Sequence, residues 1–307
     1  MTTPRTDSRR ALRARVAALL ACTAALLALP APAEAQEMAE KLRTSELTRS
    51  RSQDALRVCA DPDNLPFSNQ AGEGFENRIA ELIAKAWDRR VEYAWWPVRR
   101  GFFTRAMGQG YCDIAITAPS GMDMAATTKP FFRTGYAVVT RADGPDIRAL
   151  DDERLKTLKI GVHLLNSDAE NTPPAMALSA HGVVGNLVGF GTFYSEGGDR
   201  PEDIVKAVVD RRIDVAIVWA PLAGYFAKQL GAPVRIVPLP DDAKSGLPFS
   251  FDIGMATRRR DRALRDSLQA VIDAQGDAIR SILREFAVPL FPDRAEPARR
   301  EGTAPAR

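Results

Sequence analysis

Histidine and cysteine are scarce in this chain of 307 residues, which contains two histidines and three cysteines. The histidines, His163 and His181, lack the short spacing of a zinc site. The sequence contains no phosphate-binding loop, no dinucleotide-binding glycine motif and no Gly-x-Ser-x-Gly motif of a serine hydrolase. We therefore expect no resident metal or cofactor, and we favour a protein that is not an enzyme.

A few residues keep an enzyme interpretation open. His163 follows a predicted strand and could act as a general base, although a single histidine at a buried strand end is usually structural. Asp61, Asp63 and Glu73 could form an acid–base group around one loop, although aspartates are equally typical of tight turns. A hydrolase or lyase is thus a third interpretation, behind the two that are developed below.

Long apolar runs are also missing, since none approaches the ~20 residues that span a membrane. The apolar stretch 16–29 follows five arginines and precedes the small residues Ala33 and Ala35. This pattern is typical of a cleaved secretory leader. We predict a signal peptide over residues 1–35, cleavage near Ala35, and export of a soluble protein to the periplasm.

The predicted mature chain has no net charge. The whole chain carries 42 basic and 39 acidic residues, and residues 1–35 hold 5 and 2 of them, which leaves 37 of each. A neutral chain has no overall electrostatic attraction to nucleic acid or to anionic lipid. We therefore predict neither as a partner.

The segment after residue 55 opens with a strand, a polar loop and a helix. Leu56–Ala60 is short and apolar, which predicts a buried strand, and residues 61–69 are rich in turn-forming Asp, Asn and Pro. Apolar residues then recur at helical spacing at Phe75, Ile79, Leu82, Ile83 and Ala86. The loop follows the carboxyl end of a strand, where open α/β sheets bind their ligands.

Strand and helix patterns alternate along the rest of the chain, which predicts an α/β fold with parallel strands. We expect two lobes joined by two crossings, with lobe 1 formed by residues 55–142 and 248–292 and lobe 2 by residues 143–247. Residues 36–54 form a polar N-terminal arm and residues 293–307 a disordered tail. The predicted elements are strands at 91–97, 112–117, 136–140, 159–162, 213–219, 234–237 and 249–256, and helices at 102–107, 201–210 and 264–286.

Cys59 and Cys112 both lie on predicted strands of lobe 1. An even pair of cysteines in an exported protein favours a disulfide, and neighbouring strands can bring the two Cα atoms within the roughly 7 Å that the bond requires. The alternative is a pair of buried free thiols.

Aromatic residues follow two strands that belong to different lobes. Trp96 ends one strand and is followed by Arg100 and Phe102, whereas Trp219 ends a strand of the other lobe and is followed by Tyr225. If the lobes face each other, these clusters line opposite walls of one cleft. The predicted cleft residues are Asp61, Asn64, Phe67, Trp96, Arg100, Phe102, Trp219 and Tyr225, while Trp95 and Phe103 are predicted to pack in the core.

Several long motifs resemble one family. They are Cys59 to Asn69, Glu76-Asn77, Trp96-Pro97, Arg100-Gly101-Phe102, Cys112-Asp113, Thr128 to Arg133 and Trp219 to Phe226. Over residues 55–292 the chain is similar to the MxaJ/XoxJ proteins, which have the two-lobe fold of type II periplasmic solute-binding proteins. That family accompanies quinoprotein methanol dehydrogenases and their cytochrome c. The resemblance implies an accessory protein of such a dehydrogenase, of the lanthanide type, that binds the enzyme or the cytochrome.

The chain departs from the amino-acid-binding members of this fold at one loop. Those proteins place an arginine after the strand that corresponds to Ile114–Thr117, where it pairs with the carboxylate of the ligand. Residues 118–124 contain no arginine. This favours a protein partner over capture of an amino acid, while delivery of a small molecule to an importer remains the alternative.

Overall fold

The computed structural model describes residues 54–98, 102–164, 171–191, 199–231 and 233–292. The predicted signal peptide, arm residues 36–53, the tail and Arg100 lie outside this part of the chain. Within it, the main sheet has the strand order β4-β1-β5-β12-β7-β10-β8-β9, with β6 beside β12 and β11 beside β7. The predicted mixed α/β class is confirmed.

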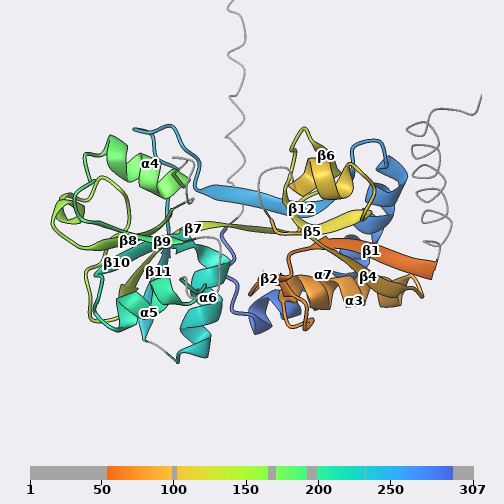
Figure 1. Cartoon of the computed structure of the whole chain (residues 1–307), viewed down its shortest axis with the longest axis horizontal. Helices are drawn as coiled ribbons and strands as arrows, with labels where there is room; N and C mark the ends of the chain where they lie inside the picture. The colour runs from red at the N-terminus through yellow and green to blue at the C-terminus, as the bar shows by residue number, and fades with distance from the viewer. Residues whose placement is uncertain (1–53, 99–101, 165–170, 192–198, 232, 293–307) are drawn as a thin grey trace, which may run out of the picture. The chain divides into compact units, whose positions relative to one another are not determined.

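The first set of strands centres on β1 (Ala55–Ala60), whose six residues are all buried. It pairs in parallel with β4 (Arg90–Trp95) on one side and β5 (Ile114–Pro119) on the other. Helices α3 (Phe75–Ala86) and α7 (Arg262–Glu285) pack on one face of these strands, as Figure 1 shows. The short helical segment η2 (Phe102–Met107) packs in a separate apolar cluster with both cysteines.

The second set of strands is parallel too, and consists of β8 (Ile160–Leu164), β9 (Leu187–Gly191) and β10 (Val215–Trp219). Its two faces bury different apolar clusters, one with α4 (Pro173–Ala180) and one with α5 (Asp203–Val209) and α6 (Ala220–Gln229). The 3₁₀ turn η3 (Glu153–Lys156) precedes this set, and β11 (Val234–Pro238) follows it.

Two long strands, β7 (Phe132–Arg141) and β12 (Ser250–Arg258), connect the sets (Figure 1). The second half of β7 pairs with β10 and β11, whereas β12 pairs with the first half of β7 and then with β5 and β6 (Ala125–Thr127). One strand carries the chain toward the second set and the other carries it back, so the two run antiparallel. The predicted parallel pairing holds for β1, β4 and β5 and for β8, β9 and β10, whereas β7 and β12 pair antiparallel with their neighbours. The lobe boundaries stay a prediction.

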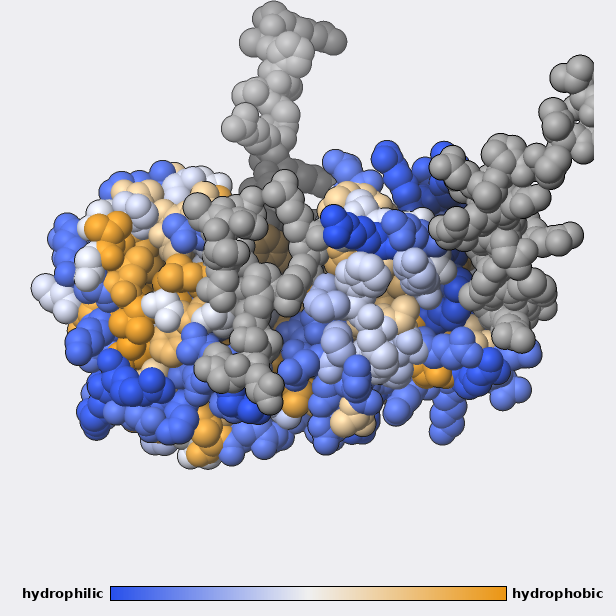
Figure 2. All heavy atoms as spheres, in the orientation of Figure 1, coloured by the Kyte–Doolittle hydropathy of each residue, from blue (hydrophilic) through white to orange (hydrophobic). Residues whose placement is uncertain are grey.

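The apolar pattern of the sequence does not predict α4 or β9, because both elements carry exposed apolar residues. The apolar residues of α4 surround the helix without forming a stripe, and Met176 is 50% exposed. Val184 and Val188, which lie just before and within β9, are 62% and 37% exposed. Figure 2 shows an apolar surface on the side of the molecule that carries α4 and β8 in Figure 1. None of the described helices is both long enough and apolar enough to cross a bilayer.

Candidate functional site

A cavity of about 250 Å³ opens at the carboxyl ends of β1 and β5. The loop after β1 contributes Asn64 and Phe67, η2 contributes Phe102, and the second set of strands contributes Trp219 at the end of β10. Carboxyl ends of parallel strands are the usual ligand site of α/β sheets because the strands diverge there into loops. The cavity thus joins residues that lie more than 150 positions apart in the sequence.

The start of α3 is fixed against the loop that lines the cavity. The side-chain oxygen of Asn77 accepts the backbone N–H groups of Gly74 and Asn69 at 3.0 and 3.2 Å, which caps the helix. A Cβ atom on Gly74 would lie 2.0 Å from the carbonyl oxygen of Phe67, so only glycine allows this contact. The backbone N–H of Glu76 donates to the same carbonyl at 2.8 Å. These bonds hold the Glu76 side chain at the cavity.

Glu76 is buried, with 8% of its surface exposed, and lines the cavity. Burial raises the pKa of Glu76 to about 7, because a desolvated carboxylate loses the hydration that stabilises its charge. A hydrogen bond from the Thr117 hydroxyl opposes this rise, and the charge of Asp61 adds to it. Near neutral pH the cavity therefore contains a carboxyl group that can gain or lose a proton.

The remaining walls are mainly aromatic. The Trp219 ring packs edge-to-face on Tyr136, with ring centroids 5.2 Å apart, and lies at an angle to the Phe251 ring, with centroids 5.6 Å apart. These neighbours fix the indole at the cavity. Phe102 and Phe103, both on η2, also line the cavity, and their rings pack edge-to-face with centroids 5.2 Å apart. Such walls favour an apolar group with one polar end.

The Cys59–Cys112 disulfide is present, with the two Cα atoms 5.2 Å apart, which confirms the prediction.

A charged cluster holds the segment that precedes β5. Arg57 binds both carboxylate oxygens of Asp113 at 2.8 and 2.7 Å and donates to the carbonyl of Gly110, while Arg258 donates to the carbonyl of Cys112. Burial opposes ionisation of Asp113, but the two guanidinium groups lower its pKa.

The comparisons with known proteins agree with one another. The protein MoxJ of Methylorubrum extorquens strain AM1 is 31% identical over 300 residues, which cover 93% of this chain and 98% of MoxJ. This chain belongs to the MoxJ/MxaJ/XoxJ family. No family model matches the chain.

Two solved structures of MoxJ/MxaJ/XoxJ proteins have the same fold. The periplasmic binding protein XoxJ of Methylobacterium extorquens AM1 is 31% identical, with a TM-score of 0.61, and the match covers 78% of this chain and 100% of XoxJ. MxaJ of Methlophaga aminisulfidivorans MPT is 26% identical, with a TM-score of 0.67 over 77% of this chain and 100% of MxaJ. The fold is the two-lobe fold of type II periplasmic binding proteins.

In this MoxJ-family chain, four of the predicted cleft residues line the cavity, namely Asn64, Phe67, Phe102 and Trp219. Asp61 acts beside it, since its carboxylate accepts the N–H of Val98 at 2.6 Å and so positions a residue of the lining. Trp96 stacks on Tyr111, with ring centroids 6.0 Å apart, and does not line the cavity.

Tyr225 also lies apart from the lining residues. Its ring stacks on Phe286 at 5.9 Å, with an angle of 16° between the planes, and packs edge-to-face on Phe226. Arg100 falls outside the described residues. A role of these two residues in binding stays a prediction.

Sequence reasoning missed Glu76, Thr117 and Phe103 as lining residues. The sequence did carry a signal for Glu76, because positions 76, 79, 80 and 83 fall on one face of a helix and the last three are apolar. An acidic residue on such a face is buried. Phe103, which was predicted to pack in the core, is half-buried and contributes to the lining.

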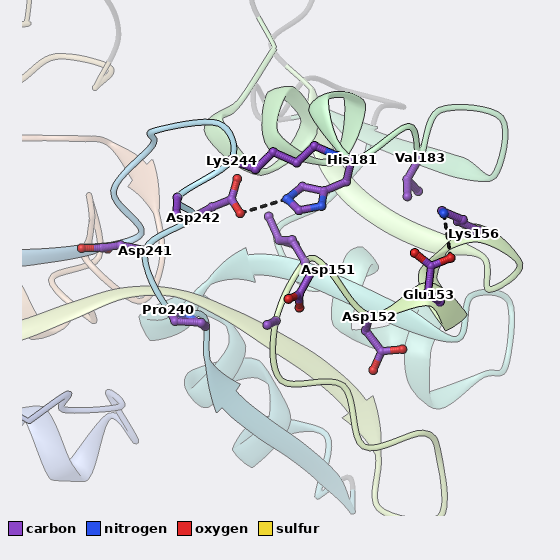
Figure 3. A pocket seen from close by; sticks show the side chains of 13 residues that line it. Asp151, Asp152, Glu153, Lys156, His181, Val183, Pro240, Asp241, Asp242 and Lys244 are labelled. Atoms are coloured by element: carbon purple, nitrogen blue, oxygen red, sulfur yellow. Dashed lines mark hydrogen bonds and ion pairs between the residues drawn. The ribbon is translucent and has the colours of Figure 1, made fainter.

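A second cavity, of about 530 Å³, lies beside the second set of strands. Figure 3 shows His181 facing Asp242 and Lys156 facing Glu153. His181 Nε2 lies 2.9 Å from Asp242 Oδ1, and Lys156 Nζ lies 2.6 Å from Glu153 Oε2. Burial opposes ionisation of Asp242, but hydrogen bonds from Ser245 and His181 lower its pKa to about 2. The His181–Asp242 hydrogen bond connects the end of α4 to the loop before β12, while the Lys156–Glu153 pair lies within η3. The first cavity is the one that four of the predicted cleft residues line.

The residues that kept an enzyme interpretation open lie outside the lining of the first cavity. Burial lowers the pKa of His163, on β8, to about 4. The Asp61 carboxylate accepts the backbone N–H of Asp63 at 3.0 Å, and the Glu73 carboxylate accepts the side-chain amide of Asn69 at 2.8 Å, so the side chains of Asp61 and Glu73 organise the loop after β1. None of them lines the cavity.

Proposed function

We propose that the protein is a non-catalytic periplasmic accessory protein of a pyrroloquinoline-quinone methanol dehydrogenase system. It binds the dehydrogenase or its cytochrome c through the cavity that Trp219 lines. Family membership supports the system, because MxaJ/XoxJ proteins accompany such dehydrogenases. The same membership supports export to the periplasm.

The observation that carries the binding role is the character of the cavity. Its described lining is mainly apolar and aromatic and contains neither lysine nor arginine. The end of β5 and the loop that follows it, residues 118–124, likewise lack arginine. The carboxylate of a free amino acid would be buried without a counter-charge, which is costly. A segment of a protein partner with apolar side chains fits these walls better.

Deletion of the gene tests the proposal. We expect the periplasm of the deletion strain to lose most of its methanol dehydrogenase activity, and the wild-type gene to restore it. We propose a partner enzyme of the lanthanide type, so the loss should appear in cultures grown with lanthanum and be absent in cultures grown with calcium alone. Full activity in the deletion strain under both conditions would contradict the proposal.

Delivery of a small molecule to an importer is the alternative, and the shared binding-protein fold favours it. A thermal-shift screen of amino acids, short alcohols and quinones separates the two. A ligand at one hundred times its dissociation constant adds about 2.7 kcal/mol to stability. A saturable shift with one such compound would support the importer, and no shift is expected for the accessory protein.

A further inference from the structure

Glu76 is the only ionisable side chain among the described residues that line the first cavity. No ion pair links its carboxyl to a cation in the part of the chain that the structure describes. The charged or titratable groups that face it are Asp61, from the loop after β1, and the Tyr93 phenol, from β4. Neither group carries a positive charge.

The other groups around the carboxyl are apolar or hydroxyl-bearing. Phe67, Phe132 and Trp219 form walls, and the Thr117 hydroxyl donates to Oε1 of Glu76. An ionised carboxylate in such surroundings is costly unless a cation pairs with it. Aromatic ring faces attract cations as well. The cavity thus has negative charge and apolar walls but no positive partner among its described residues.

We propose that the cavity receives a primary ammonium group on a short apolar stem, and that Glu76 pairs with this ammonium. The Glu76 carboxyl already has hydrogen bonds to the Thr117 hydroxyl, the Thr117 backbone N–H and the Ser68 hydroxyl. A carboxylate accepts about four hydrogen bonds, so it has room for a single ammonium donor rather than for the two-pronged guanidinium of arginine. This inference rests on the proposed use of the cavity as a binding site and names the chemistry that enters it.

The volume is sufficient for such a group. A cavity of about 250 Å³ has room for about eight non-hydrogen atoms at the roughly 30 Å³ that one water molecule occupies in the liquid. A butylammonium ion has five, and so does the side chain of lysine. The same chemistry can therefore come from a free alkylamine or from a lysine of the partner protein.

Calorimetric titration of the mature protein with n-butylamine at pH 8 tests the proposal, with n-butanol as the neutral ligand of matched size. We expect butylamine to bind saturably and butanol at least tenfold more weakly. Glu76→Gln should weaken butylamine binding at least tenfold, because the amide keeps the hydrogen bond from Thr117 but loses the charge. Glu81→Gln, which removes an exposed acid from the same helix, should leave the affinity unchanged.

The pH dependence of the unmutated protein provides a test that does not depend on the folding of a variant. The amine stays protonated below pH 9, whereas a carboxyl with a pKa of about 7 loses its charge on acidification. Lowering the pH from 8 to 5.5 should weaken butylamine binding roughly thirtyfold. Absence of butylamine binding, equal binding of butanol, or an affinity unaffected by both pH and Glu76→Gln would overturn the proposal.

The source of the ammonium is distinguished by titration with Nα-acetyl-lysine amide. Binding of this compound with the same dependence on Glu76 assigns the site to a lysine side chain, while binding of butylamine alone assigns it to a free amine. If neither binds although the dehydrogenase does, the ammonium assignment fails and the proposed function stands.

Discussion

The Thr117 hydroxyl on β5 donates a hydrogen bond to the carboxyl of Glu76 on α3, across 41 residues of sequence. The bond ties the start of a helix to the end of a strand at the wall of the cavity. Burial raises the pKa of that carboxyl to about 7, so its charge depends on pH near neutrality. Glu76 therefore affects both the stability of the fold and the charge of the cavity.

Glu76→Gln should reduce the dependence of stability on pH between 4.5 and 7. The pKa of Glu76 in the folded protein, about 7, lies above the ordinary value of 4.5, so the folded state binds the proton more tightly. Proton binding at Glu76 therefore stabilises the folded state by on the order of 3 kcal/mol. This stabilisation is complete below pH 4.5 and is lost as the pH rises through about 7. Urea unfolding at pH 5 and pH 8 measures this. An identical pH dependence in wild type and Glu76→Gln, with Glu81→Gln as the control, would count against a buried, titrating Glu76.

His163 should contribute in the opposite direction. Burial lowers its pKa from 6.5 to about 4, so the unfolded chain takes up the proton first. Stability from this residue is complete above pH 6.5 and is lost as the pH falls through about 4. We therefore expect the free energy of unfolding of His163→Gln, measured relative to that of the wild type, to be higher at pH 4 than at pH 7. A difference between the two proteins that does not vary with pH would show that the histidine is accessible to protons in the fold.

Loss of the disulfide should destabilise the first set of strands. Cys59 and Cys112 close a loop with a sequence separation of 53 residues, for which the chain-entropy model gives about 4 kcal/mol. The double variant Cys59→Ala, Cys112→Ala should unfold at correspondingly lower urea concentration. Reductant should destabilise the wild type and leave the double variant unchanged. Equal sensitivity of both proteins to reductant would contradict this account.

Two substitutions of Tyr225 distinguish a role in packing from a role in binding. Its ring stacks on Phe286 rather than lining the cavity. Tyr225→Ala should therefore lower the free energy of unfolding by about 1–3 kcal/mol, while Tyr225→Phe, which keeps the stacking ring, should change it little. The sequence also predicts a binding role for Tyr225, in which case a folded Tyr225→Phe should bind the partner more weakly than the wild type. Unchanged affinity of the folded Tyr225→Phe would contradict that role and leave only the packing role.

Most of the secondary structure was predictable because the apolar patterns are strong. The six buried residues of β1 and the stripe of α3 carry this information locally. The antiparallel course of β7 and β12 was not predictable from them, because strand direction depends on which strands become neighbours. For α4 and β9, exposed Met176 and Val188 obscure the pattern that burial normally produces.

The candidate site was predictable only in part. Three predicted residues line the cavity, and each lies near the end of a helix or strand that the sequence pattern locates. Phe67 lies in the loop after β1, Phe102 begins η2 and Trp219 ends β10. Trp96 and Tyr225 come from the same two aromatic clusters, yet their rings stack on Tyr111 and Phe286. Sequence shows that a ring is near a strand end, but which way the ring points depends on side chains from distant segments.

Partner binding tests the central claim most directly. Calorimetric titration of the mature protein with the purified methanol dehydrogenase, and separately with its cytochrome c, should show saturable binding to at least one of them. Trp219→Ala should weaken that binding by about 2 kcal/mol or more, roughly thirtyfold, because central tryptophans in interfaces carry much of the binding energy. Trp87→Ala, at the end of α3 and outside the cavity lining, is the matched control and should bind normally. Absence of binding to both proteins, or equal affinity of the Trp219 variant and the wild type, would contradict the account.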